Sequence, residues 1–293
     1  MITRVTHQMT ARTAAQNLQA SLAQLNRLTD QATSNTRITR PSDDPSGTAE
    51  SLRLRGEQRL AQQHTRNAQD GLGWLTTADT AIQAGLDLIG RAQDLTIQGA
   101  NGAMSPAGRE ALAVEIDGIR EALLVQANST FGGRSVFAGT SDAGMAFGPD
   151  GTYVGVPGAT VHRRVGPDES VRVDADGAAV FGSGPGSVFA LMADIAADLR
   201  SGADVSPRID AIDERRQEML GELAGVGTRY NRLEVAQVAT QERMGGLESR
   251  LSAVEDVDMA RMIIDLKSAE VAYQGALGVT ARVLQNSLLD FLR

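Results

Sequence analysis

The most informative absences in this sequence are those of cysteine, aromatic side chains and basic runs. The 293 residues include no cysteine, which excludes disulfides, thiolate metal sites and a cysteine nucleophile. Aromatic residues make up only 3% of the chain, which is too few for a large compact α/β enzyme with a shaped pocket. The net charge is -8 and the isoelectric point is near 5.0, so neither nucleic acid nor a membrane surface is an expected partner.

Long apolar runs are also missing. No run approaches the roughly eighteen residues that would span a bilayer. Residues 1–16 hold no apolar core and no small-residue cleavage site, so we expect no secretory signal peptide there. If the chain is exported, it must leave by another route, and without disulfides its exported form must be held by burial alone.

Helical periodicity at both ends of the chain is the main positive signal. Near the start, Leu18, Leu22 and Leu25 recur at steps of four and three, which makes a thin apolar stripe on a polar helix. A matching stripe runs along residues 252–293. It includes Ile263, Leu266, Leu277, Leu284, Leu288 and Phe291. Because an isolated helix has no core in which to bury a stripe, we predict that these side chains form an assembly interface.

A fixed corner follows the first helix. Pro41 stops that helix, and Asp44 is placed to cap a new helix with Pro45 at its first position. The adjacent carboxylates of Asp43 and Asp44 suggest acid and base catalysis at first sight, but neighbours in the chain do not face each other. We therefore interpret Pro41, Asp43, Asp44 and Pro45 as a joint between helices.

Serine and proline residues typical of helix N-termini mark the starts of further helices between the two ends of the chain. A second helix is expected from Pro45 to about residue 99, and Ser105 with Pro106 starts another that ends near residue 130. Helix resumes at residues 187–199 and again from Ser206, with a heptad pattern that continues for six repeats. The apolar stripes of these helices are interpreted as the core of one bundle.

Two smaller features belong to this helical part. The only tryptophan, Trp74, lies one step from an apolar seam and is assigned to the core or its edge. Ser252–Glu255 is interpreted as a possible capping box, and hence as a joint before the terminal helix.

The pattern changes to short strands in the middle of the chain. Residues 131–140 combine a glycine turn with alternating apolar residues, which predicts a hairpin. Glycines and turn signals continue to residue 186 and predict a small β-rich insertion. Asp174–Gly177 is interpreted as a hairpin turn, because the remaining ligands of a calcium loop are missing.

No pattern of catalytic, cofactor-binding or metal-binding residues is found. His7, His64 and His162 lie far apart in the sequence, without a partner at metal-ligand spacing. Neither a nucleophile elbow nor a phosphate-binding glycine loop is present. We therefore predict no catalytic residue, no cofactor and no metal ion.

Together these patterns predict a mainly α protein, an elongated helical-bundle or coiled-coil rod formed by the N- and C-terminal halves, with a small β-rich domain inserted in the middle. The expected domains are an N-terminal polymerisation helix (1–40), the first part of a helical rod (41–140), the β-rich domain (141–186), the second part of the rod (187–251) and a C-terminal polymerisation helix (252–293).

Several stretches resemble the flagellin superfamily of bacterial flagella. Arg37–Pro45 (RITRPSDDP) and Leu284–Leu292 (LQNSLLDFL) are similar to the corner and the ending of hook-associated protein 3, the hook-filament junction or FlgL family. Asn67–Asp79 and Phe131–Thr140 resemble elements of the shared helical region. The likeness covers residues 1–140 and 187–293, with two small departures from the junction pattern, at Thr39 and Asn286.

This resemblance implies a structural, non-enzymatic subunit that joins hook to filament. It implies that copies assemble into a ring or helical array through paired terminal helices, with another hook-associated protein on the hook side and flagellin on the filament side. It also implies type III export to the extracellular flagellum and escort of the C-terminal region by a cytoplasmic chaperone. Two alternatives stay open: flagellin itself, the filament subunit, and an enzyme displayed on the filament in residues 140–186.

Overall fold

The computed structural model describes residues 2–291, and the side chains of residues 9–282. Most of this part is α-helical, which confirms the predicted fold class. The helices are α1 (Ile2–Ser34), α2 (Pro45–Gly99), α3 (Pro106–Ala127), α4 (Gly177–Phe181), α5 (Val188–Ser201), α6 (Ser206–Glu255) and α7 (Met259–Phe291). The strands are β1 (Thr130–Phe131), β2 (Arg134–Ser135), β3 (His162–Arg164) and β4 (Ser170–Arg172), and Gly184–Gly186 form one 3-10 turn.

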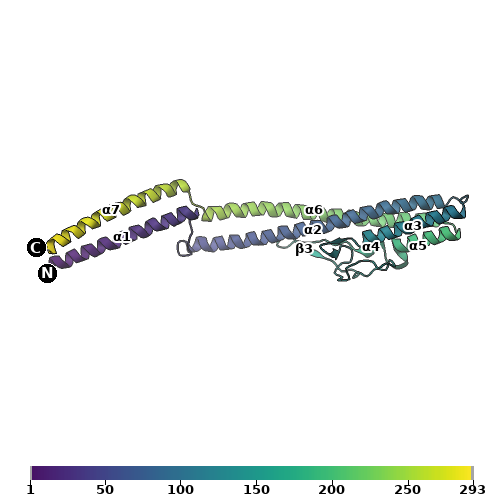
Figure 1. The fold of residues 1–293 in the computed structure, drawn as a ribbon, viewed down its shortest axis with the longest axis horizontal. Coiled ribbons are helices and arrows are strands. Elements are labelled where there is room, and N and C mark those ends of the chain that lie inside the picture. Colours follow the sequence, from purple (N-terminus) through teal and green to yellow (C-terminus); the bar gives the residue numbers. More distant parts are fainter. Residues whose placement is uncertain (1, 292–293) are drawn as a thin grey trace. The chain divides into compact units, whose positions relative to one another are not determined.

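The chain divides into two compact units. The first unit holds residues 1–59 and 244–293, and the second holds residues 60–243. Helices α2 and α6 therefore contribute to both units. Figure 1 shows the pair α1 and α7 of the first unit side by side, and the packed helices α3 and α5 of the second.

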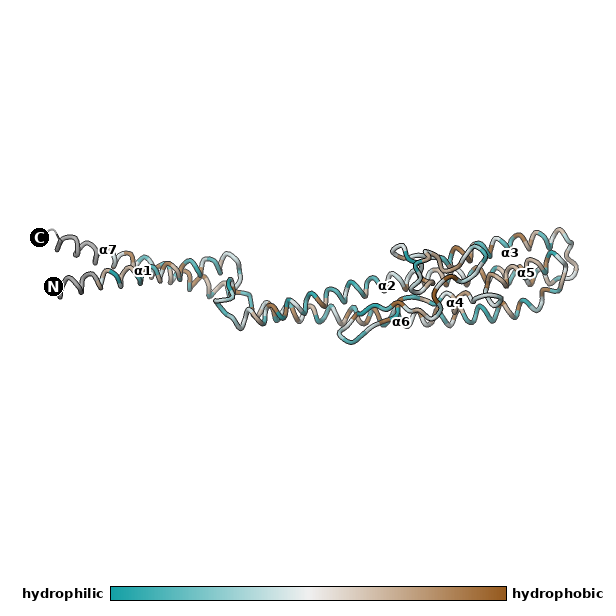
Figure 2. The backbone as a smooth tube through the Cα atoms, turned by 90° about the horizontal axis from the view of Figure 1, so that it is seen from below, coloured by the Kyte–Doolittle hydropathy of each residue, from teal (hydrophilic) through white to brown (hydrophobic). Residues whose placement is uncertain are grey.

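The second unit is a helical bundle with a continuous apolar core. Apolar side chains of α2, α3, α5 and α6 are buried together. Figure 2 shows brown, hydrophobic positions recurring along these helices. Its fully buried members include Leu75, Ile82, Ile89, Ile116, Leu123, Met192 and Ile195. Trp74 is 3% exposed and meets Phe131 edge to face, so its predicted place in the core is confirmed.

Aromatic residues from the inserted segment and from the residues on either side of it join this core. Phe137, Phe147, Phe181 and Phe189 are all fully buried, and Phe147 contacts both Phe181 and Phe189 with ring centroids 5.8 and 4.9 Å apart. These four are most of the six phenylalanines of the chain. Aromatic pairs of this kind contribute about 0.5–1.5 kcal/mol beyond their buried area. The scarce aromatic residues are therefore concentrated where the inserted segment meets the helical bundle.

The strands are short, and they form two antiparallel pairs. β1 pairs with β2 across a turn in which Gly132 and Gly133 have φ of 57° and 79°, a conformation that glycine adopts without strain. This hairpin was predicted, although it covers fewer residues than expected. β3 pairs with β4 in a register that places Arg163 opposite Val171.

Most helices begin and end at the capping residues that the sequence predicted. The Ser105 hydroxyl accepts a hydrogen bond from the Gly108 N–H and so caps α3, and the Ser187 hydroxyl caps α5 in the same way. Gly202, in the left-handed conformation, ends α5.

Two local predictions were wrong. Asp174–Gly177 is not a hairpin turn, because the buried Asp174 carboxylate accepts a hydrogen bond from the Val161 N–H at 2.6 Å and Asp176 caps α4. The predicted cap at Ser252 lies inside α6, and Asp258 caps α7 instead. In both places, a carboxylate finds backbone donors that the local pattern did not reveal.

Candidate assembly surface

The terminal helices α1 and α7 pack against each other along one side of each. The covered and half-covered positions of α1 include Ala11, Ala14, Leu18, Ser21, Leu25, Leu28 and Ala32. Those of α7 include Met262, Leu266, Ala269, Tyr273, Ala276 and Thr280. Both sets alternate steps of three and four, which is the spacing of a coiled-coil seam. Only Leu28 and Met262 among these residues are below one-tenth exposed, so the pair has a thin core.

A second apolar surface lies on the outside of α7. Ile263, Ile264, Val271 and Val279 are 62%, 69%, 60% and 59% exposed. At 100° per residue, Ile264 and Val271 lie on the side roughly opposite the seam with α1. Helix α7 is therefore apolar on two sides, and its own chain covers only one of them. We define the outer face as Ile263, Ile264, Val271 and Val279.

The structure separates the predicted interface residues into three groups. Leu18, Leu25 and Leu266 lie in the seam between α1 and α7. Leu22, Ile263 and Leu277 are 39%, 62% and 43% exposed and lie outside the covered positions of that seam. The side chains of Leu284, Leu288 and Phe291 lie outside the described residues.

The joint before α2 is built around two carboxylates. Asp44 Oδ1 accepts hydrogen bonds from the Gly47 N–H and the Ser46 hydroxyl, both at 2.8 Å, and thereby caps the helix that begins at Pro45. Asp43 Oδ2 accepts hydrogen bonds from the Thr39 hydroxyl and from the Arg40 N–H, both at 2.9 Å. Both carboxylates therefore accept hydrogen bonds from backbone N–H groups of the joint.

Gly47 and Pro41 complete this joint. A Cβ atom on Gly47 would come within 2.5 Å of Asp44 Oδ2 and 2.6 Å of Ile38 Cδ1, so only glycine fits beneath the cap. Pro41 lies in the exposed turn between α1 and α2, and it lines a shallow hollow together with Ile38 and Glu255.

Four side chains then hold the two chain segments of the joint together, and we call them the clasp: Arg37, Ser51, Arg55 and Glu255. Arg55 meets the Glu255 carboxylate with two nitrogens, at 2.8 and 3.1 Å, and the Ser51 hydroxyl donates to the same carboxylate. The Arg37 nitrogen donates to the Glu255 carbonyl at 2.6 Å, and its guanidinium reaches the Val254 carbonyl at 3.0 Å. The clasp therefore fixes the end of α6 to the start of α2.

The electrostatics of the joint follow from these contacts. The Arg55 guanidinium and the Ser51 hydroxyl hold the pKa of Glu255 below its usual value. Hydrogen bonds from Gly47 and Ser46 lower the pKa of Asp44, and those from Thr39 and Arg40 lower the pKa of Asp43. All three groups are therefore anionic at neutral pH.

Sequence reasoning did not single out Ser51, Arg55 or Glu255 as interacting residues. Arg55 and Glu255 are 200 positions apart, so no local pattern connects them. Arg37, which also contacts Glu255, lies inside the corner motif. That motif was the one signal in the sequence that pointed to this site.

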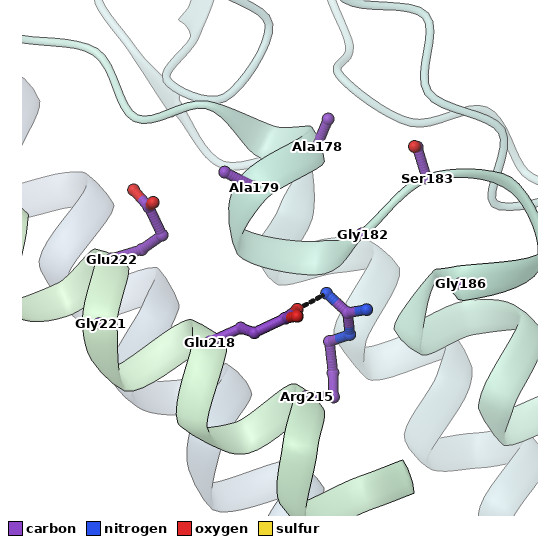
Figure 3. Close-up of a pocket in the computed structure, with 9 residues that line it drawn as sticks. All are labelled: Ala178, Ala179, Gly182, Ser183, Gly186, Arg215, Glu218, Gly221 and Glu222. Carbon is purple, nitrogen blue, oxygen red and sulfur yellow. Dashed lines mark ion pairs between the residues drawn. The ribbon is translucent and has the colours of Figure 1, made fainter.

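The second unit contains a hollow beside the inserted segment, which is where an active site would be sought if that segment were an enzyme. It has a volume of about 530 Å³ and is lined by α4, the loop after it and α6. Figure 3 shows Arg215 paired with Glu218, while the Ser183 hydroxyl points away from this pair. Its nine lining residues include no histidine, so Ser183 has no imidazole base beside it there.

The described part of the chain contains neither a cluster of metal ligands nor a membrane-spanning helix. There, no three His, Asp or Glu side chains come close enough together to hold a metal ion. Within residues 2–291, no helix combines the length and apolar character needed to cross a bilayer.

Two models of known protein families match this chain. The model of the bacterial flagellin N-terminal helical region matches residues 5–142, and that of the bacterial flagellin C-terminal helical region matches residues 209–292. These matches cover well over half of the sequence, and they include the α1 seam, the joint and the described part of α7. The chain belongs to the flagellin superfamily.

Individual relatives include a filament protein and hook-associated proteins. The flagellar filament 33 kDa core protein of Treponema phagedenis is 25% identical over 310 aligned residues, which cover 99% of each chain. Among solved structures, a Vibrio parahaemolyticus protein described as a flagellar hook-associated protein superposes with a TM-score of 0.68, at 19% identity, over 73% of this chain and 100% of its own. FlgL of Bacillus cereus superposes with a TM-score of 0.61, at 22% identity, over 68% and 99%. The chain thus shares its fold with hook-associated proteins.

Proposed function

We propose that this chain is a structural, non-enzymatic subunit of the bacterial flagellum that forms the junction between hook and filament. The observation that supports assembly is that the apolar side chains of the outer face of α7 are exposed. Burial of each such side chain contributes about 1.5–3 kcal/mol, and α1 already occupies the other side of the helix. A neighbouring copy is the natural cover, because repeating subunits would meet this face with the same geometry each time.

The proposed partners follow from that position. Copies of the chain assemble into a ring or a helical array through α1 and α7. Another hook-associated protein lies on the hook side, flagellin lies on the filament side, and a cytoplasmic export chaperone escorts the C-terminal region before assembly. The final location is the extracellular flagellum, at the hook-filament junction. In this proposal the chain needs no cofactor, and neither nucleic acid nor membrane is a partner.

The corner sequence and the shared fold with hook-associated proteins support a junction role over a filament role. The test is a strain that lacks this gene. If the chain is the junction, flagellin is still made and exported, and it appears unattached in the medium while hooks remain bare. If no flagellin is found in cells or medium, the chain is the filament subunit and the junction proposal is overturned.

Filament subunit is the second candidate, and the full-length likeness to filament core proteins favours it. Native flagella distinguish the two by stoichiometry. A junction protein is found as a short zone at the base of each filament, so antibody labelling gives one spot per flagellum. A filament subunit gives continuous labelling along the whole length.

The assembly surface can be tested separately, because Lys267 is the only lysine in the chain. It is exposed, and its ammonium pairs with Glu270 at 2.9 Å on α7. We expect an amine-reactive label to modify Lys267 in the monomer and to react at least several-fold less in assembled flagella. Equal reaction in both forms would mean that this part of α7 stays uncovered.

A charge on the outer face gives the matching variant. We expect Ile264→Glu to leave the monomer folded and to abolish assembly, since burying an unpaired carboxylate costs several kcal/mol. The control is Gln274→Glu, which adds the same charge at an exposed polar position of α7. Assembly of Ile264→Glu at the level of the control would remove the outer face from the interface.

A further inference from the structure

The turn between α2 and α3 contains the only Asn-Gly pair of the chain, Asn101–Gly102. Both residues are exposed, and the turn lies at one end of the bundle (Figure 1). Asparagine is among the thermally labile residues of proteins. The backbone nitrogen of the next residue can attack its side-chain amide, and glycine in that position shields the nitrogen least. Whether the attack occurs in the folded chain depends on the geometry of the turn.

The side chain of Asn101 is held against the residues that follow it. Asn101 Oδ1 accepts a hydrogen bond from the Ala103 N–H at 3.2 Å, which closes a short turn through the side chain. The ring closed by this bond contains both the Asn101 Cγ and the Gly102 nitrogen, so the two atoms that would react are held together. The same bond places a donor at the oxygen on which negative charge develops during the attack.

The attacking nitrogen is not engaged elsewhere in the described turn. The amides of Ala100, Asn101, Ala103 and Met104 all donate hydrogen bonds within the chain, whereas the Gly102 N–H of the same turn donates none. A Cβ atom placed on Gly102 would meet no atom within 4 Å, so the space around this residue is open. The Gly102 nitrogen therefore reaches solvent and loses its proton without first breaking a hydrogen bond of the fold.

We propose that Asn101 is a self-modification site, at which the folded chain converts asparagine into aspartate and isoaspartate without an enzyme. The Gly102 nitrogen gives its proton to solvent and forms a bond to Asn101 Cγ, while the bond from Cγ to Nδ2 breaks and ammonia leaves with a proton from water. Water then opens the cyclic imide. Cleavage between the Gly102 nitrogen and Cγ gives aspartate, and cleavage between that nitrogen and the main-chain carbonyl carbon gives isoaspartate. The net reaction consumes one water and releases one ammonia.

The products change both the charge and the backbone of the turn. Each adds a carboxylate to the surface, and in isoaspartate the main chain runs through Cγ and is one carbon longer. The Met104 N–H donates to the Asn101 carbonyl at 3.1 Å, and in isoaspartate this carbonyl becomes part of a side-chain carboxylate. Met104 packs against the core of the bundle. We therefore expect the Met104 amide to exchange several-fold faster in the isoaspartate form than in the unmodified chain.

A second turn of the chain offers a matched control. Asp150 Oδ1 accepts a hydrogen bond from the Thr152 N–H at 3.0 Å, which is the same side-chain turn as that of Asn101. There, however, the Gly151 N–H donates to the Gly148 carbonyl at 2.9 Å, and Gly151 is buried. Asp150→Asn keeps the accepting oxygen and creates a second Asn-Gly pair, in which the attacking nitrogen is engaged. The two pairs then differ in the state of that nitrogen.

Mass spectrometry of the full-length chain measures the reaction. The protein is kept at mildly alkaline pH, folded or in urea, and then cut with trypsin, which releases residues 92–109 with Asn101 as their only asparagine and residues 135–163 with the pair created by Asp150→Asn. The mass reports the exchange of an amide for a carboxyl group, and chromatography separates aspartate from isoaspartate. We expect Asn101 to react in the folded chain at least as fast as in urea. The pair created by Asp150→Asn should react at least about tenfold more slowly folded than in urea, because its hydrogen bond must open first.

A second variant tests the role of Gly102 without disturbing the fold. Gly102 lies in open space and does not have a left-handed φ, so Gly102→Ala should fold as the wild type does. We expect it to react at least about tenfold more slowly, because the added methyl group crowds the nitrogen and restricts the backbone. The wild-type rate should rise with pH, since the nucleophile is the deprotonated nitrogen. Asn101 that stays intact in the folded chain while it reacts in urea, an unchanged rate in Gly102→Ala, or products without isoaspartate would each overturn the proposal.

Discussion

The bundle of residues 60–243 and the terminal pair of α1 and α7 are both helical, yet they bury their apolar side chains in different ways. The bundle encloses four phenylalanines and rows of leucine and isoleucine that are fully buried. The terminal pair covers a seam rich in alanine and leaves Ile263, Ile264 and Val271 exposed. The bundle thus buries a large apolar core, whereas the terminal pair buries little and leaves several large apolar side chains of α7 exposed.

The largest expected difference between the two regions is in amide exchange of the monomer. Amides at Leu75, Ile82 and Ile89 in the bundle should exchange only through global unfolding. Amides at residues 269–280 of α7 need only the thin seam to open, so we expect them to exchange at least about a thousandfold faster. Mass spectrometry of peptides from the two regions checks this, and equal protection would contradict the comparison.

The core of the bundle should be the most sensitive to truncation. Phe147 is fully buried and contacts Tyr153, Phe181 and Phe189. Phe147→Ala should lower the free energy of unfolding by about 3–5 kcal/mol, because it leaves a cavity as well as removing buried area. Urea denaturation followed by Trp74 fluorescence measures the loss. A loss below about 1 kcal/mol would mean that the inserted segment packs independently of the bundle.

The sequence predicted the bundle better than the terminal pair, for a physical reason. In the bundle, strong caps such as Ser105 and Ser187 fix where helices begin, and apolar residues lie on one face. In α7, apolar residues occur on more than one face, so only part of the expected stripe meets α1: Leu266 lies in the seam, whereas Ile263 and Leu277 lie outside it. The seam side of α7 mixes small residues with Met262, Leu266 and Tyr273, so residue size alone does not identify it in the sequence.

The joint shows a different limit. The cap by Asp44 could be predicted, because a capping residue and its helix are neighbours in sequence. The pairing of Arg55 with Glu255 could not, because it depends on how two distant segments come together. The carboxylate that caps α7, Asp258, was missed for a related reason: Ser252 and Glu255 offered an equally good local pattern, with the predicted cap six residues earlier.

Removal of the clasp should have an intermediate effect, confined to the first unit. Glu255 is mostly buried, and Glu255→Gln loses the charge that Arg55 pairs with, so we expect a loss of about 1–2 kcal/mol there. Exchange of amides near residues 250–256 and 36–55 measures this change. The Trp74 transition of the second unit should stay the same in this variant.

The same residue gives a pH dependence. The folded-state pKa of Glu255 lies below its ordinary value of 4.5, so its contribution to stability is present above pH 4.5 and is lost as the pH falls below it. Protection at the joint should decline below pH 4.5 in the wild type, and this part of the decline should be absent in Glu255→Gln. An identical acid profile in both proteins would assign the effect to other carboxylates.

The smallest effects on the monomer provide the sharpest comparison of the two regions. Val125 on α3 and Ile264 on α7 are 68% and 69% exposed, so truncation of either to alanine should change monomer stability by no more than about 0.5 kcal/mol. The variants should differ only in assembly. Ile264→Ala should weaken incorporation into flagella measurably, since its side chain becomes buried against a neighbouring copy, whereas Val125→Ala should assemble as the wild type does. Equal incorporation of both variants would show that exposure of a large apolar side chain on α7 has no more meaning than exposure on the bundle.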